Sequence, residues 1–561
     1  MWVSYRRLIV LVGFFILIFA GLLLQLIYLQ IIEAGNLAKK AVRQRTSELV
    51  LDDGRGDILD RSGLPLTGAE KKQVLVVFPS FLEVDNDHHS ILTALSDVKE
   101  PGSTEHTEPF IAAGNIDYDR LVEKQIPGLL IAEKYDRYSN EVWASHLLGH
   151  LGPRDREGKI GLEYVFNEKL SPERPNSLAA IVDGKNRLIE GIGYRYRSDT
   201  RRYGPSNLIL SVDLEIQKIM EEVMDNRMVQ GAAVVMDPHQ GDILAMASRP
   251  NYNPDEISSY LNFQNDYQEY LSLDPFINRA ILSYSPGSIF KLVVAAAALE
   301  TNTVSLFENF TCPGYIEVGS DTFRCSNHAG HGEITFAEGF AYSCNTVFIE
   351  TALKLGRETL YKYAMKLGLG QKTGVPLGSK REGGEVPGFI TSPQEMPFLG
   401  DLALMALGQG AMEATPLQVA RLTSIIAGGG SNVYPRLVQS INTRQGDELQ
   451  RFPAPRLTDQ LLSPSVVQQL KFMMMGVTTY GTGQEAFSEN FPVGGKTGTA
   501  ETGRMINGRD ETYSWFTGIA PINSSPQVVI TVFIEKAIDD TIAAAVFQEI
   551  SKNIMKSLDR E

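Results

Sequence analysis

Ser288-Ile-Phe-Lys291 is the most informative stretch of the chain, because it places a hydroxyl and an amine one helical turn apart. Pro286 and Gly287 form a turn before it, and residues 292–299 are apolar and rich in alanine. We expect a buried helix that holds Ser288 and Lys291 rigidly on one face. A serine hydroxyl becomes a strong nucleophile when an adjacent base takes its proton, so this pair predicts acyl transfer.

Two further motifs follow in order, Ser343-Cys-Asn345 and Lys496-Thr-Gly498. They would add a polar proton relay and a cation for a substrate carboxylate. Lys496 lies in a glycine-rich segment, 492–500, which is followed by residues 515–521 and by the apolar run 528–534. We expect these three segments to form paired strands.

The same short patterns also occur elsewhere, and their context separates them from the first set. Ser96-Asp-Val-Lys99 lies in a polar stretch without an apolar helix after it. Lys372-Thr-Gly374 lies between turn-rich segments, so we expect a loop there.

Longer segments extend the pattern over nearly the whole chain. They are Arg55-Gly-Asp-Ile-Leu-Asp-Arg-Ser-Gly63, Gly161-Leu-Glu163, residues 235–245, Asn278-Arg279, Gly408-Gln-Gly410 and Thr415-Pro-Leu-Gln418. With the three motifs in order, the chain resembles the class B penicillin-binding proteins, of the division or sporulation type rather than the bifunctional class A. That family consists of D,D-transpeptidases that cross-link peptidoglycan. The resemblance implies an α+β fold, with an antiparallel sheet between helical layers and the nucleophile at the start of a buried helix.

Composition and hydropathy favour a large exported protein with one membrane anchor. The 561 residues are 43% hydrophobic, and the net charge of −15 argues against a nucleic-acid partner. Residues 8–32 form an uncharged segment that is long enough to span a bilayer as a helix. No good signal-peptide cleavage site follows it. We therefore expect an anchor at 1–33, an elongated pedestal domain at 34–205 and a transpeptidase domain at 206–561. Basic residues flank both ends of the anchor, so an extracytoplasmic catalytic domain rests on the resemblance.

The resemblance also implies roles for single residues. Ser288 would attack the penultimate D-alanine of a donor stem peptide, and a neutral Lys291 would take its proton. Ser343 would relay a proton, and Asn345 would bond Lys291 and the substrate amide. The substrate carboxylate and the oxyanion would be held by Lys496, Thr497, Gly498 and Thr499, with the backbone N–H groups of Ser288 and Thr499 forming the oxyanion hole.

The implied partners are peptidoglycan stem peptides that end in D-Ala-D-Ala, β-lactams, the membrane, and division or elongation proteins. The pedestal is too short for a glycosyltransferase domain, so glycan polymerisation would come from a partner. A D,D-carboxypeptidase and a β-lactam sensor without turnover remain alternatives. A β-lactamase and a non-catalytic scaffold fit less well, and a role in division, elongation or sporulation stays open. We expect no cofactor.

The cysteines and histidines allow several interpretations. Four possible metal ligands lie within twenty residues, namely Cys312, Cys325, His328 and His331. Thiols in an oxidising compartment usually pair before they bind zinc, so we expect no metal there. Cys344 is either a small buried apolar residue or the disulfide partner of Cys325 or Cys312. His146 and His150 lack the adjacent glutamate of a zinc-protease helix, so we expect a structural role for them.

Overall fold

The chain was analysed as a computed structural model in which two compact units are distinguished. The smaller unit contains Met1–Gly54, Lys71–Asp136 and Pro172–Arg201, and the larger contains Arg55–Glu70, Arg137–Ser171 and Arg202–Glu561. The structure describes residues 2–35, 37, 46–81, 108–112, 126, 128–138, 141–153, 155–183, 188, 193–199, 201, 204–228, 230–262, 268–271, 273–379, 384–454, 459–506, 509–523, 528–537 and 541–558.

The chain begins with an apolar helix, α1 (Trp2–Ile27), which continues into a π-helical turn, η1 (Tyr28–Ile32). Within the described residues, Tyr5–Ile32 is the one helical segment long and apolar enough to cross a membrane, with a mean hydropathy of 2.8. This segment fits the expected single-pass anchor.

The smaller unit contains two three-stranded sheets. One has the order β1-β6-β7 and the other β4-β3-β5. A small apolar core that includes Leu51, Val76, Phe78 and Leu178 joins them. The strands are β1 (Thr46–Asp52), β3 (Glu70–Val77), β4 (Phe110–Ala112), β5 (Leu129–Asp136), β6 (Asn176–Ile181) and β7 (Tyr194–Arg197).

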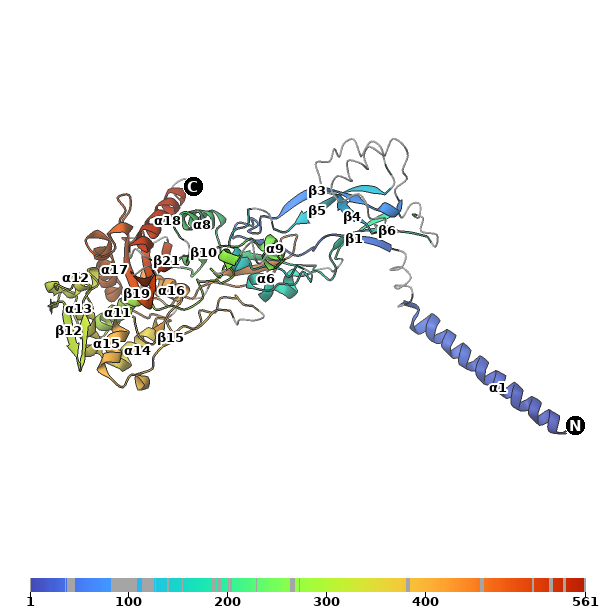
Figure 1. Ribbon diagram of the computed structural model, residues 1–561, viewed down its shortest axis with the longest axis horizontal. Coiled ribbons are helices and arrows are strands. Elements are labelled where there is room, and N and C mark those ends of the chain that lie inside the picture. Colours follow the sequence, from blue (N-terminus) through green and yellow to red (C-terminus); the bar gives the residue numbers. More distant parts are fainter. Residues whose placement is uncertain are drawn as a thin grey trace. The chain divides into compact units, whose positions relative to one another are not determined.

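The larger unit is built on a five-stranded antiparallel sheet in the order β10-β9-β21-β20-β19 (Figure 1). Its strands are β9 (Gly231–Met236), β10 (Ile243–Arg249), β19 (Gly494–Ile506), β20 (Arg509–Ala520) and β21 (Val528–Ala537). Because side chains alternate along a strand, Ala232 and Val234 join one apolar cluster, and Ala233 and Val235 join another. The expected paired strands and central antiparallel sheet are thus confirmed.

Helices cover both faces of this sheet. α8 (Leu214–Arg227) and α18 (Ile542–Leu558) pack on one face, and α16 (Pro416–Ala427) and α17 (Pro464–Thr479) pack on the other. α11 (Lys291–Glu300) contacts α17 and is buried along nine of its ten residues. The expected sheet between helical layers, with a buried helix after the nucleophile, is therefore confirmed.

Further elements complete the larger unit. A second sheet has the order β18-β17-β8-β2, and three two-stranded antiparallel sheets pair β11 with β14, β12 with β13 and β15 with β16. The strands are β2 (Ile58–Leu59), β8 (Asn207–Leu210), β11 (Asn309–Cys312), β12 (Tyr315–Val318), β13 (Asp321–Arg324), β14 (Gly332–Thr335), β15 (Phe389–Ile390), β16 (Met412–Glu413), β17 (Val438–Asn442) and β18 (Glu448–Arg451). The remaining helices are α5 (Ser145–Leu148), α6 (Gly161–Val165), α7 (Asn167–Leu170), α9 (Ile257–Asn262), α10 (Gln268–Leu271), α12 (Phe336–Ala341), α13 (Asn345–Leu355), α14 (Arg357–Lys366) and α15 (Leu399–Ala406).

The two N-terminal motifs meet inside the larger unit. Glu163 is fully buried, and its carboxylate accepts hydrogen bonds from Arg55 Nη2 at 2.9 Å and from Arg137 Nε at 2.5 Å. The segments that carry these residues therefore pack with the catalytic part of the chain, although both lie before residue 206. The division expected at residue 205 stays a prediction.

Candidate active site

Ser288 lies in a 3₁₀ turn, η4 (Gly287–Phe290), directly before α11. Gly287 has φ +52°, and a Cβ there would lie 2.3 Å from the carbonyl oxygen of Thr499. A Cβ on Gly498 would lie 2.8 Å from the carbonyl oxygen of Pro286. Both glycines are therefore needed for the turn to lie against β19. This packing brings partly exposed Ser288 next to the third motif.

Lys291 is fully buried at the first position of α11, and its amine contacts the second motif. Nζ donates to the backbone oxygen of Ser343 at 2.7 Å, to Ser343 Oγ at 3.1 Å and to Asn345 Oδ1 at 2.8 Å. The expected bond between Asn345 and Lys291 is confirmed. Three fixed acceptors hold the amine in one position beside the nucleophile turn.

The Ser-x-Asn motif joins α12 to α13 in a tight backbone turn. Ser343 has φ +56°, in the left-handed region that non-glycine residues rarely adopt. Cys344 is the N-cap residue of α13, and Asn345 is the first residue of that helix. Asn345 Nδ2 donates to the backbone oxygen of Arg324 at 2.9 Å, so both ends of its amide are fixed.

The third motif lies on β19, the edge strand of the five-stranded sheet in the described part of the chain. Lys496 is fully buried, and its Nζ donates to Ser343 Oγ at 3.0 Å and to Thr497 O at 3.0 Å. Thr497 and Thr499 are partly exposed on alternate positions of the strand. An edge strand offers free backbone groups to an extended peptide, and the two threonines would flank such a peptide.

The two buried amines influence each other's protonation. Burial lowers the pKa of Lys291 to about 8, although the nearby Cys344 and Cys325 thiols act in the opposite direction. Burial, and then the charge of Lys291, lower the pKa of Lys496 well below its usual range. Since both amines bond Ser343 Oγ, the two pKa values belong to the pair, and loss of one proton favours retention of the other.

The structure thus gathers the predicted residues and leaves the rival motif apart. The backbone N–H groups of Thr373 and Gly374 bind the Glu385 carboxylate at 2.6 and 3.0 Å, and residues 371–378 form no helix or strand. The loop expected around Lys372 is confirmed. Ser96 and Lys99 lie outside the described residues. His146 is buried and bonds the backbone oxygen of Pro275 at 2.8 Å, as expected for a structural residue.

Some contacts at the site were missed in the sequence. Thr482 Oγ1 lies 2.6 Å from Thr497 Oγ1, and Thr482 N donates to Ala341 O at 3.0 Å, which links β19 to α12. The aromatic rings of Phe348 and Phe340 lie 5.7 and 5.6 Å from the amines of Lys291 and Lys496. In the sequence, Thr482 is marked only by its position in a polar stretch before β19. Polar stretches of this kind are too common to identify a site residue.

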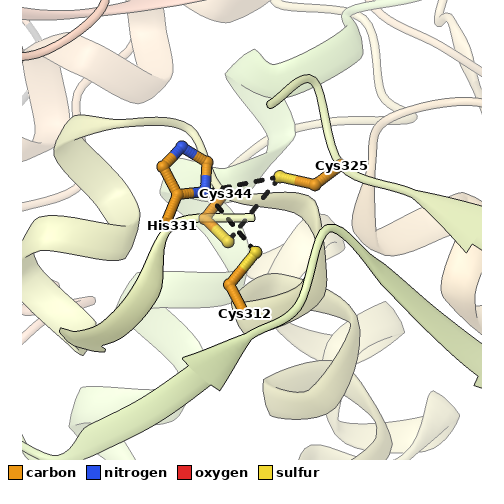
Figure 2. A group of neighbouring side chains, drawn as sticks. All are labelled: Cys312, Cys325, His331 and Cys344. Carbon is orange, nitrogen blue, oxygen red and sulfur yellow. Dashed lines mark hydrogen bonds between the residues drawn. The ribbon is translucent and has the colours of Figure 1, made fainter. Parts of the chain in front are cut away.

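The cysteines also form a group that sequence reasoning placed only in part. Cys312, Cys325 and His331 come together, but Cys344 joins them in place of His328 (Figure 2). The thiols of Cys325 and Cys344 lie 3.8 Å apart, and all three cysteines are free.

Comparison with known proteins agrees with this geometry. Residues 231–556, more than half of the chain, match the family model of the penicillin-binding protein transpeptidase domain. Stage V sporulation protein D of Bacillus subtilis is 29% identical, over 99% of this chain and 86% of its own. Peptidoglycan D,D-transpeptidase MrdA of Acinetobacter baumannii is 27% identical, over 95% of this chain and 85% of its own.

A solved structure is similar over nearly the full length. It belongs to a study of the structural coordination of polymerization and crosslinking by a peptidoglycan synthase complex. Its TM-score is 0.70 at 26% identity, and the match covers 97% of both chains. The similarity therefore includes the N-terminal unit as well as the matched domain.

Proposed function

Since the chain belongs to the penicillin-binding protein transpeptidase family, as a class B penicillin-binding protein, we propose that it cross-links peptidoglycan through an acyl-enzyme on Ser288. The enzyme is a serine-type D,D-transpeptidase. One observation carries the residue assignment. The amines of Lys291 and Lys496 both donate to the Ser343 hydroxyl, at 3.1 and 3.0 Å. One oxygen atom therefore connects three motifs that are distant in sequence.

In the proposed acylation step, Lys291 removes the proton of Ser288 as the hydroxyl oxygen attacks the carbonyl of the penultimate D-alanine. A lysine with a pKa of about 8 is neutral often enough near pH 7 to act as a base. The negative charge on the carbonyl oxygen would be bound by the backbone N–H groups of Ser288 and Thr499. One such donor is typically worth about 3 kcal/mol in the transition state.

The proton then moves from Lys291 to the leaving amine through Ser343. The Ser343 hydroxyl already bonds Lys291, so it can accept a proton from the ammonium side and donate its own to the amine of the terminal D-alanine. The C–N bond breaks, and D-alanine leaves as a neutral amine. In the second half-reaction the acceptor amine attacks the ester, and its proton returns by the same route to the Ser288 oxygen.

Lys496 would serve as the cation for the substrate carboxylate, together with Thr497. A carboxylate beside Lys496 raises the pKa of that amine, because it stabilises the charged form. Lys291 is then the member of the pair that loses its proton when substrate binds. A β-lactam carries an equivalent carboxylate and would acylate Ser288 in the same way.

The surroundings of the enzyme follow from its anchor and its relatives. The apolar segment Tyr5–Ile32 would anchor the protein in the cytoplasmic membrane. The family implies that the catalytic unit lies outside, where peptidoglycan is assembled. The similar synthase complex, in which polymerization and crosslinking are coordinated, supports a glycan-polymerising membrane partner. Alkaline phosphatase fused after residue 561 should be active in cells if this orientation is correct.

The central test is labelling with fluorescent penicillin, followed by mass spectrometry of the adduct. We expect the adduct on the peptide that contains Ser288, and its loss in Ser288→Ala. Ser96→Ala is the matched control, because Ser96 lies in the other Ser-x-x-Lys sequence. An adduct that survives Ser288→Ala would overturn the assignment. Products of a stem peptide with and without an acceptor amine would separate transpeptidation from carboxypeptidation.

A further inference from the structure

A cluster of three thiols and one imidazole lies directly beside the Ser-x-Asn motif (Figure 2). The ligand atoms of Cys312, Cys325, His331 and Cys344 all lie within 4.8 Å of one another. The three cysteines are at most 1% exposed, and none is in a disulfide. Three buried thiols and one imidazole gathered from four separate positions of the chain need an explanation beyond ordinary apolar packing.

The distances in the cluster fit a tetrahedral metal site. Zinc binds thiolate sulfur at about 2.3 Å and imidazole nitrogen at about 2.0–2.1 Å, so a tetrahedron has S–S edges of about 3.8 Å and S–N edges of about 3.6 Å. Cys325 Sγ and Cys344 Sγ lie 3.8 Å apart. His331 Nδ1 lies 3.5 Å from Cys312 Sγ and 3.6 Å from Cys325 Sγ. The remaining edges, up to 4.8 Å, would shorten by about 1.2 Å or less around an ion.

The backbone holds the loops that carry these ligands close together. A Cβ on Gly330 would lie 2.3 Å from the carbonyl oxygen of Cys312, so the two strands of chain touch through bare backbone. Cys325 N also donates to Gly314 O at 2.8 Å. Cys312 ends β11, and Cys325 follows the last residue of β13. The ligands are thus set by strand ends and a helix cap rather than by one flexible loop.

We propose that Cys312, Cys325, His331 and Cys344 bind one zinc-class divalent cation through three thiolates and the Nδ1 atom of a neutral imidazole. Binding replaces the protons of the thiols, which leave to solvent. Four protein ligands fill a tetrahedral shell, so the ion has no open position and acts as a structural centre. The ring of His331 stacks on Tyr342 at 5.7 Å, which fixes its orientation.

This centre would position the active site, and that consequence rests on the proposed function. Cys344 lies between Ser343 and Asn345 in sequence. The backbone oxygen of Arg324, directly before Cys325, accepts the hydrogen bond from Asn345 Nδ2 at 2.9 Å. A metal that ties Cys325 to Cys344 therefore holds both partners of that bond in register. Cys344 and its fellow ligands are positioning residues, since none of them has to contact the substrate.

The competing arrangement is a disulfide between Cys325 and Cys344. A disulfide needs sulfur atoms about 2.05 Å apart, and these lie at 3.8 Å. Its formation would also leave Cys312 and His331 beside each other without a shared ligand. Zinc uses all four residues, whereas the disulfide uses two, and the two states can be distinguished chemically.

The test begins with the metal content of full-length protein purified in detergent without chelators. We expect about one zinc per chain by plasma mass spectrometry and most of it lost in His331→Ala. His328→Ala is the matched control, because His328 is exposed and outside the cluster, and it should keep its zinc. His331→Cys supplies another zinc ligand at the same position and should restore binding. Cobalt exchanged into the wild-type protein should show thiolate charge-transfer and tetrahedral ligand-field absorption, a measurement that needs no variant.

Labelling with fluorescent penicillin then tests the positioning role. Removal of zinc by a chelator should slow acylation of Ser288 by about 10–100-fold, the range seen when the surroundings of such centres are disturbed, and zinc should restore it. Metal-free protein with a Cys325–Cys344 disulfide, or with three free thiols that bind no cobalt, would overturn the metal site. Zinc-loaded protein that labels equally well after stripping would overturn the positioning role. Zinc-loaded protein never labelled at Ser288 would instead contradict the proposed function and leave the metal site standing.

Discussion

Replacing Lys291 with arginine should abolish acylation, whereas the same replacement at Lys496 should only weaken it. With a pKa of about 8, roughly one Lys291 amine in ten is neutral at pH 7, against about three in ten thousand for an ordinary lysine. Burial alone therefore raises the supply of base by about 300-fold. A guanidinium has a pKa above about 12, so fewer than about one in 10⁵ would be neutral, and Lys291→Arg should lose about 10⁴-fold in rate.

The assay is the second-order rate of labelling by fluorescent penicillin between pH 6 and pH 9. In the wild type, this rate should rise about tenfold per pH unit below pH 8 and then level off, because the reactive form is the deprotonated amine. Lys496→Arg keeps the cation for the carboxylate, so it should retain the rising limb with a lower plateau. A flat profile between pH 6 and pH 8, or equal rates for the two arginine variants, would refute Lys291 as the base.

Three further substitutions test other parts of the structure. Asn345→Asp places a carboxylate beside the Lys291 amine, so the pKa of Lys291 should rise and the pH–rate profile of labelling should move to higher pH; an unmoved profile would contradict the contact. Gly287→Ala forces a Cβ to 2.3 Å from Thr499 O at φ +52°. Labelling should be lost, and thermal unfolding should show a destabilisation above about 1 kcal/mol. Normal labelling would show that the turn need not lie against β19. Glu163→Gln removes the carboxylate between two buried arginines and should destabilise the protein by about 3–5 kcal/mol in denaturant unfolding, whereas an effect below about 1 kcal/mol would mean that the ion pairs add little.

Local patterns in the sequence allowed much of the fold to be predicted. The helix after Ser288 and the paired strands around Lys496 both depend on short-range periodicity. Thr415 is the N-cap of α16, Pro416 is its first residue, and Gln418 completes a capping box. Such features are set by neighbours in the sequence, so they can be recognised without an alignment.

The features that were missed depend on packing between distant segments. The buried carboxylate of Glu163 binds the guanidiniums of Arg55 and Arg137, and no local pattern encodes that pairing. Cys312, Cys325, His328 and His331 were grouped as possible ligands because they lie within twenty residues, and Cys344 was left out of that group. The fold instead leaves His328 exposed and brings Cys344, the N-cap of α13, to the other three residues.

The left-handed backbone of Ser343 lowers the stability of the folded protein at a residue that the proposed reaction needs. A non-glycine residue in this conformation destabilises the folded state by about 1–2 kcal/mol, and a glycine at the same position would remove that penalty. Selection for thermal robustness alone would therefore favour Ser343→Gly, and the same change would delete the hydroxyl that bonds both Lys291 and Lys496. The retained serine marks a position where the chain gives up stability for chemistry, and attempts to thermostabilise the enzyme should leave it untouched.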